Sequence, residues 1–263
     1  ITPAFSVFIL GCVLSFVIVR NQIVHLWDEL RLWGAFPKIL HFTERLQLGD
    51  GVYSFKAMQS YPPFMPLFVY YLTSFSASFN EASIFWIYSI FCLSLLSHVF
   101  DRMSWKAWAW IIPACILTIV IPLVFYANRG DAAYFYRSLF IDPVLGVLIG
   151  YSISKALKLD DSKLLDCVHF HLALFVLTTI KDSGVIFAIA ATLIAVLNKH
   201  VKTRKKLTWL VFALGVCLLS FFSWKWVMKA YHISESIPLK ANKGFLVLDN
   251  WKVFWTALWQ KTM

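Results

Sequence analysis

The stretch PAFSVFILGCVLSFVIV, residues 3–19, is apolar along its whole length, and HLWDELRLWG, residues 25–34, begins six residues later. A helix of about 17–25 mostly apolar residues can cross the ~30 Å hydrocarbon core of a bilayer. Residues 3–19 therefore predict a first membrane span, with the carboxylates of Asp28 and Glu29 just beyond its end. Two carboxylates at the mouth of the first span of so apolar a chain make this stretch the first place to look for a function.

The composition of the whole chain agrees with this reading of its first segment. The hydrophobic fraction is 60%, the mean hydropathy is +0.70 and only 14% of the residues are charged. Soluble domains contain about 45–50% apolar and about 25% charged residues. The sequence therefore predicts an all-α polytopic membrane protein. Its net charge of +10 does not point to nucleic acid as a partner, because the basic residues gather in short loops where they set topology.

Further apolar runs predict the remaining spans. They cover residues 83–100, 107–127, 138–154, 164–180, 184–198 and 207–224. An additional run, PPFMPLFVYYLTSFSAS at 62–78, is long enough to cross but contains three prolines, and its length alone does not decide whether it spans.

Three loops between these runs are basic. They carry Arg102 and Lys106, then Lys155, Lys158 and Lys163, then Lys199, Lys202, Arg204, Lys205 and Lys206. Two spans separate each loop from the next, so all three face one side, and the positive-inside rule makes that side cytoplasmic. If residues 62–78 cross, the acidic pair is also cytoplasmic. If they lie along the surface, the chain has seven spans and the acidic pair is outside.

The segment between the first span and residue 82 is expected to form juxtamembrane helices. In AFPKILHFTERLQ, residues 35–47, Pro37 suits a first helical turn. The apolar face would hold Phe36, Ile39, Leu40 and Leu46, with Lys38, His41, Glu44 and Arg45 turned to water. Such a helix lies in the interface plane, and LGDG at 48–51 predicts a turn.

We expect residues 1–263 to form a single transmembrane module. Residues 20–82 would be its first external loop, and residues 225–263 would begin a later one. The start ITPAF and the end WQKTM suggest the N-terminal part of a longer chain. The cysteines lie inside apolar runs without a CxxC pair, and His169 and His171 point to different helix faces, so neither a disulfide framework nor a zinc site is indicated.

The order of the motifs carries a resemblance to a known superfamily. An apolar span followed by Asp-Glu, then YPPF (61–64), FIDPVLG (140–146), TTIKDSG (178–184), a basic loop and SFFSWKWV (220–227) occur in sequence. This order resembles the GT-C superfamily of membrane glycosyltransferases, in the branch of protein O-mannosyltransferases and the aminoarabinose transferase. The resemblance implies transfer of a sugar from a polyprenyl-phosphate donor to a glycan, lipid, teichoic polymer or protein acceptor. The active site would face outside, in the cell membrane or in the ER membrane of a eukaryote, and some members of the superfamily use a divalent cation.

The resemblance also implies roles for the acids. Asp28 and Glu29 match the family's acidic pair, which acts on the acceptor or binds a metal, and a carboxylate can take the proton of an acceptor hydroxyl. The alternative is a helix N-terminal acid that complements the macrodipole, with Glu29 solvated. Asp142 matches the second acidic position; the alternative is an N-cap before Pro143. Asp131 is a weaker candidate for the second acid.

Basic residues near span ends could meet the donor phosphate. Lys181 matches a family lysine that precedes a glycine, although Asp182 and Ser183 stand between Lys181 and the glycine here. Arg129 and Arg137, in NRGDAAYFYR, could serve with Lys181. The alternative for Lys181 is interfacial snorkelling. YPPF lacks the lysine that some relatives carry just before it, and Lys56 is a distant substitute.

Two other functional classes remain open from the sequence. A transporter or flippase would place charged residues near the middle of spans and would contain paired broken helices. The acids here sit at span ends instead. A catalytically silent scaffold subunit with the same fold is the other alternative.

Overall fold

The computed structural model describes most of the chain apart from several loops and the C-terminal segment. The described residues are 1–26, 28–46, 48, 59–76, 78–101, 103–124, 126–127, 133–134, 137–159, 163–198 and 203–233. The expected turn at 48–51 therefore lies largely outside the described part.

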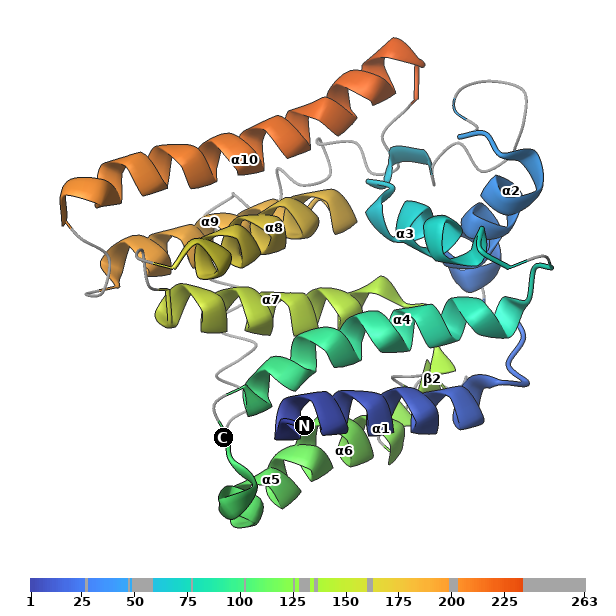
Figure 1. Cartoon of the computed structure of the whole chain (residues 1–263). Helices are drawn as coiled ribbons and strands as arrows, with labels where there is room; N and C mark the ends of the chain where they lie inside the picture. Colours follow the sequence, from blue (N-terminus) through green and yellow to red (C-terminus); the bar gives the residue numbers. More distant parts are fainter. Residues whose placement is uncertain are drawn as a thin grey trace, which may run out of the picture.

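The described chain is helical, as predicted, with long helices stacked side by side (Figure 1). The long rods are α1 (Pro3–Val19), α4 (Glu81–Leu96) continued by η3 (Ser97–Phe100), α7 (Ile141–Leu157), α8 (Leu164–Ile180), α9 (Gly184–Leu197) and α10 (Thr203–Ala230). A further rod runs from η4 (Trp105–Ala107) through α5 (Trp108–Cys115) and η5 (Ile116–Val120) to α6 (Ile121–Val124). Two-residue strands, β1 (Tyr126–Ala127) and β2 (Ala133–Tyr134), pair antiparallel. Each apolar run predicted as a span corresponds to one rod.

The rod from η4 to α6 is irregular for a local reason. Pro113 lies inside α5 and Pro122 lies in α6, and neither residue has a backbone N–H to donate. The π-helical segment η5 lies between them. Prolines and π-helical turns are each known causes of irregularity in a helix.

The rods alternate in direction, which gives the bundle two distinct ends. The indole N–H of Trp86 in α4 donates to the carbonyl of Cys12 in α1 (3.0 Å), and Val24, just after α1, donates its N–H to Glu81 at the start of α4 (2.9 Å). We call the end where α1 finishes and α4, α7 and α9 begin the acidic end, since it holds Asp28 and Asp142. The opposite end, with Lys106, Lys155, Lys158 and Lys163, is the basic end.

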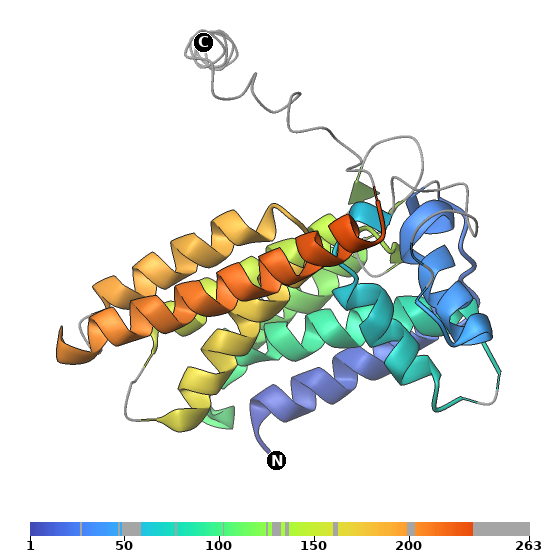
Figure 2. The ribbon, with the colours of Figure 1, turned by 90° about the horizontal axis from the view of Figure 1, so that it is seen from above.

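Residues 62–78 do not run between these two ends. Their helix α3 (Phe64–Thr73) has 10 residues, about 15 Å of helix, and it lies with α2 (Ala35–Thr43) at the acidic end (Figures 1 and 2). Because α1 finishes and α4 starts at this same end, the intervening segment returns to its starting side. This geometry favours the arrangement in which residues 62–78 lie along the surface.

Helix α2 matches the predicted amphipathic helix in part. Pro37 lies in its first turn, Leu40 is buried and Lys38 is exposed. The helix ends at Thr43, because Glu44 adopts a left-handed conformation (φ 53°). His41 was expected to face water, and that prediction was wrong: its ring packs against Phe42 and Phe79, with centroids 5.4 and 5.2 Å away.

The turn between α8 and α9 explains the glycine of TTIKDSG. A methyl group at Gly184 would lie 1.7 Å from the carbonyl oxygen of Leu177. Only glycine allows this close approach of the two helices. The turn therefore presents Lys181 and Asp182 at the acidic end.

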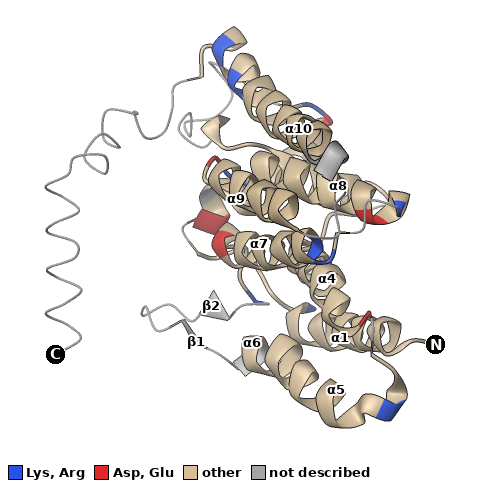
Figure 3. Cartoon of the chain, turned by 90° about the vertical axis from the view of Figure 1, so that its left-hand side faces the viewer, with Lys and Arg blue, Asp and Glu red and all other residues tan. Residues whose placement is uncertain are grey.

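Within the described part of the chain, two helices are long and apolar enough to cross a membrane, Glu81–Phe100 with 20 residues and Leu207–Ala230 with 24. Five further apolar helices have between 10 and 17 residues. The outward surface of the rods is apolar as well: α1 buries Val7 and Cys12 while it exposes Phe5, Leu10 and Val13. The charged residues of the described chain gather at helix ends (Figure 3).

Helix α10 is longer than the sequence predicted. The predicted span ended at residue 224, whereas the helix continues to Ala230. Lys225 is accommodated within the helix, since its ammonium bonds the carboxylate of Asp182 at 3.0 Å.

Candidate active site at the acidic end

Asp28 is an exposed carboxylate at the start of a short helix. It directly precedes the π-helical segment η1 (Glu29–Trp33) and has helical backbone angles. Its side chain makes no capping hydrogen bond, and among the described residues it has no hydrogen-bond or ion-pair partner. Its oxygens therefore keep their lone pairs for a proton or a ligand.

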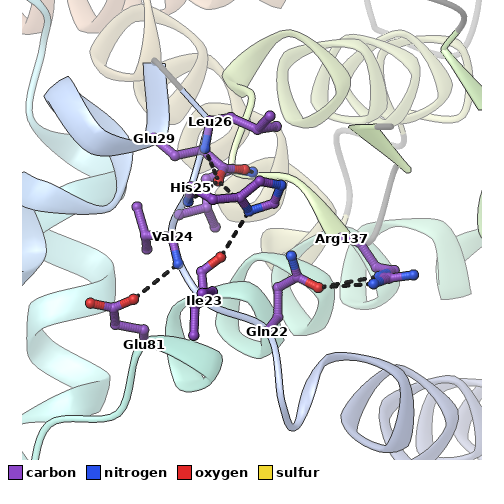
Figure 4. A network of polar contacts seen from close by, with 9 residues as sticks. Gln22, Ile23, Val24, His25, Leu26, Glu29, Glu81 and Arg137 are labelled. Carbon is purple, nitrogen blue, oxygen red and sulfur yellow. Dashed lines mark hydrogen bonds and ion pairs between the residues drawn. The ribbon is translucent and has the colours of Figure 1, made fainter. Parts of the chain in front are cut away.

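Glu29 is the opposite case, a fully buried carboxylate with 0% exposure. One oxygen accepts the N–H of Leu139 at 2.9 Å. The other accepts those of Leu26 and His25 at 3.3 and 3.4 Å (Figure 4). The alternative of a solvated Glu29 is therefore wrong. Because backbone donors occupy both oxygens, the geometry favours a positioning role for Glu29, which holds the loop bearing Asp28 against the entry to α7.

The rest of this loop is also tied to distant segments. Gln22 accepts two hydrogen bonds from the guanidinium of Arg137, both at 3.2 Å (Figure 4). Glu81 accepts the N–H of Val24 and forms an ion pair with Lys38 at 2.8 Å. The loop after α1 is thus connected to α2, α4 and the segment before α7.

Asp142 and Lys181 form an ion pair between α7 and α8. Asp142 is the second residue of α7 and 72% exposed, while Lys181 follows the last residue of α8 and is 26% exposed. The N-cap is Phe140, so the alternative of Asp142 as an N-cap is wrong. The pairing orients Lys181 toward the entry of α7.

The structure thus gathers Asp28, Glu29, Arg137, Asp142 and Lys181 at one end of the bundle. Their links run from Glu29 to Leu139, from Arg137 to Gln22 and from Lys181 to Asp142. Arg129, Asp131 and Lys56 lie outside the described residues.

Several residues of this end were not singled out from the sequence. Gln22 and Glu81 carry no local signal, because their partners lie far away in the chain. Lys225 did carry one, since a lysine inside an apolar helix indicates a function or a partner. Its partner, Asp182, belongs to the turn that the resemblance had already marked.

The described residues do not form a metal site. Among them, no group of three or more His, Cys, Asp and Glu side chains is arranged to hold a metal ion. The resemblance connects Glu29 with a metal, but both of its carboxylate oxygens accept hydrogen bonds from backbone N–H groups. The described residues alone therefore do not supply the ligands of a resident divalent cation.

No protein-family model matches the chain, and neither a curated protein nor a solved structure matches it.

Proposed function

We propose that the chain is the transmembrane module of a GT-C-type glycosyltransferase. It would move a sugar from a polyprenyl-phosphate donor to an acceptor at the acidic end, on the extracytoplasmic side. The proposal rests on one observation: a candidate base and candidate phosphate-binding cations lie at the same end of the bundle. The base is Asp28, a carboxylate without a described partner, and the cations are Lys181 and Arg137.

The apolar exterior supports a membrane setting for the bundle. The outward faces of the rods expose Phe, Leu, Ile and Val side chains over the length of the helices, which water would disfavour. Exposed Trp105, Trp108 and Trp110 lie at the basic end, where an interfacial aromatic belt would be expected. By the positive-inside rule the basic end faces the cytoplasm, so the acidic end faces outside or, in a eukaryote, the ER lumen.

The proposed reaction uses Asp28 as the general base. Asp28 takes the proton of an acceptor hydroxyl while the hydroxyl oxygen attacks the anomeric carbon of the sugar. The bond between that carbon and the phosphate oxygen breaks, and its electron pair leaves on the phosphate. Lys181, with Arg137 or Arg129, stabilises the charge of the departing lipid phosphate.

Asp142 acts in this scheme through Lys181. The carboxylate of Asp142 already pairs with the ammonium of Lys181, whereas that of Asp28 has no described partner. We therefore assign the base to Asp28, and Asp142 orients the lysine. The acceptor could be a glycan, a lipid, a teichoic polymer or a protein.

The test is turnover of purified protein with labelled polyprenyl-phosphate sugars and a panel of these acceptors. Release of the lipid phosphate together with labelled acceptor is expected. Movement of the intact donor across a vesicle membrane without release would instead identify a transporter or flippase. Neither release nor movement, with folded protein, would leave a scaffold subunit and overturn the proposal.

A further inference from the structure

A small polar cavity of about 80 Å³ lies at the basic end, where η3 finishes, α7 finishes and α8 begins. Its wall comes from three rods and carries charges of both signs. The residues that line it are His98, Asp101, Lys155, Lys158 and Asp166. All of them belong to the described part of the chain, and the proposed sugar transfer at the opposite end uses none of them.

Two polar groups of this wall lack a hydrogen-bond partner among the described residues. Lys155 is only 8% exposed, and the carboxylate oxygen of Asp166, 3.8 Å from its ammonium, lies beyond hydrogen-bond distance. His98 turns its Nδ1 to the carboxylate of Asp101, and its buried Nε2 has no partner. Because an ionised carboxylate only accepts, Nδ1 of the neutral ring carries the proton and Nε2 is an acceptor. Buried polar atoms are rarely left unpaired, so an occupant should accept from Lys155 and donate to His98.

The charges of the wall disfavour an ion of a single sign. An anion would meet Lys155 and Lys158 but would also face two carboxylates, and a cation would meet the reverse. A zwitterion with a phosphate and a primary ammonium offers each wall charge its opposite. The short ethanolamine linker keeps these two groups within a few ångströms, as are the ammonium of Lys155 and the carboxylate of Asp166.

The cavity lies beside the apolar surface of the bundle. Val99, Leu157 and Leu165 are next in sequence to residues of the wall, and they are 48%, 61% and 70% exposed. Exposed apolar side chains of this kind suit the acyl chains of a lipid. With the basic end toward the cytoplasm, the cavity is at the level of the headgroups of the cytoplasmic leaflet.

We propose that this cavity binds the headgroup of a phosphatidylethanolamine of the cytoplasmic leaflet. Its phosphate accepts hydrogen bonds from Lys155 and Lys158, and its ammonium donates to Nε2 of His98 and to the carboxylate of Asp166. Phosphatidylcholine is a poor substitute, because its trimethylammonium group is bulkier and has no N–H to donate. The inference rests on the membrane setting in the proposed function and not on sugar transfer.

The test is native mass spectrometry of the purified protein in detergent with phosphatidylethanolamine, phosphatidylcholine or phosphatidylglycerol of the same acyl chains. Phosphatidylethanolamine should be retained at concentrations where the other two lipids are lost. Phosphatidylcholine lacks the N–H donors and phosphatidylglycerol lacks the positive charge, so the pair isolates the contribution of the ammonium. Retention of either competitor as strongly as phosphatidylethanolamine would overturn the proposal and leave the cavity to water or to an anion.

Two variants of the wall test the site, and a third is their control. Asp166→Asn keeps the size of the side chain and removes its charge, so retention of phosphatidylethanolamine should weaken roughly tenfold. Lys158→Gln removes a cation near the phosphate and should weaken retention roughly fivefold. Lys106→Gln changes an exposed lysine of the same end that does not line the cavity, and it should behave like the wild type. Wild-type retention in both wall variants, with thermal unfolding unchanged, would overturn the site.

Soluble O-phosphoethanolamine distinguishes a lipid from a free compound of the same chemistry. It should displace phosphatidylethanolamine only at a concentration at least about a hundredfold higher, because the acyl chains bury apolar surface. Displacement at equal concentration would overturn the lipid assignment. A protein that retains phosphatidylethanolamine but transfers no sugar would contradict only the proposed function.

Discussion

The two ends of the bundle use charge in different ways. At the basic end the ion pairs are short-range: His98 contacts Asp101 three residues later in the same rod, and Lys155 of α7 lies 3.8 Å from Asp166 of the next rod, α8. These side chains line a cavity of about 80 Å³. At the acidic end the contacts join distant segments, such as Glu29 to Leu139, 110 residues apart, and Arg137 to Gln22, 115 residues apart.

This difference indicates which end carries specific geometry. At the basic end the long-range hydrogen bonds come from neutral side chains, since Asn198 donates to the carbonyl of Ala156 and Trp105 to that of Ile1. The carboxylates of its ion pairs stay partly exposed, Asp101 at 48% and Asp166 at 30%. The acidic end instead fixes a long loop against the starts of α4 and α7, at the cost of burying Glu29. A buried carboxylate must be fully hydrogen-bonded to be tolerated, so the loop has one well-defined position, as a site requires.

The largest expected effect is that single cysteines at the two ends of the bundle react with a membrane-impermeant reagent from opposite sides of the membrane only. In a background without the native cysteines, Arg45→Cys at the acidic end should react with a membrane-impermeant maleimide only from outside. Lys106→Cys at the basic end should react only from the cytoplasmic side, and both should react after permeabilisation. If both cysteines react from the same side, the two ends of the bundle do not face opposite sides of the membrane. That result would also contradict an active site on the outer face.

The next effect concerns catalysis at Asp28. Asp28→Asn keeps the shape and removes the base, so sugar transfer should fall at least about a hundredfold, while the protein folds normally. Turnover of the labelled donor measures this loss. Glu44→Gln, an exposed acid at the same end, should transfer at the wild-type rate. Near-normal transfer by folded Asp28→Asn would shift the base to Asp142.

Glu29 should matter for stability more than for chemistry. Glu29→Ala leaves three backbone N–H groups without their acceptor, and we expect a loss of about 2–5 kcal/mol in the free energy of unfolding. Glu29→Gln keeps one oxygen acceptor, so it should lose less stability, and its transfer should fall less than that of Asp28→Asn. Thermal unfolding in detergent, compared with Glu44→Ala, measures the effect; equal stability of the two alanine variants would refute the positioning role.

Lys181 should affect donor use. Lys181→Ala removes a charge-assisted hydrogen bond to the phosphate, which should weaken donor affinity about tenfold. Lys181→Arg should keep most of it. Lys229→Ala, an exposed lysine at the same end, is the matched control. Donor titrations measure this affinity. If both Lys181 variants bind the donor as tightly as the wild type, Lys181 does not contact the phosphate and only its interfacial role remains.

The smallest effect is expected at the basic end. Lys155→Met removes the partner of Asp166, which is 30% exposed at its side chain and can be solvated. Lys155 itself is buried at 8% exposure, but its carboxylate partner is partly exposed and 3.8 Å away, so the pair should contribute about 1 kcal/mol, and sugar transfer should not change. Assays of unfolding and of turnover on the same preparation check both statements. A loss of transfer would show that the two ends are coupled.

The positions of the rods could be predicted from the sequence, because an apolar run of sufficient length is a local property. Residues 3–19, 164–180 and 184–198 match α1, α8 and α9 within one residue at either end. The end of α10 was missed, since Lys225 looked like the start of a loop. Its neutralisation by Asp182, 43 residues earlier, cannot be read from the local pattern.

The sequence by itself determined the helical class, the apolar rods and the common side of the three basic loops. The tertiary structure placed the acidic pair at the opposite end, because residues 62–78 do not run between the two ends. Only the tertiary structure decided that Glu29 is buried while its neighbour Asp28 is exposed, and that Asp142 binds Lys181. The physical reason is that hydropathy sums over neighbours in the chain, whereas the burial of a charge depends on donors that distant segments supply. For Glu29 the shortest of these hydrogen bonds comes from Leu139, a residue with which it shares no local pattern.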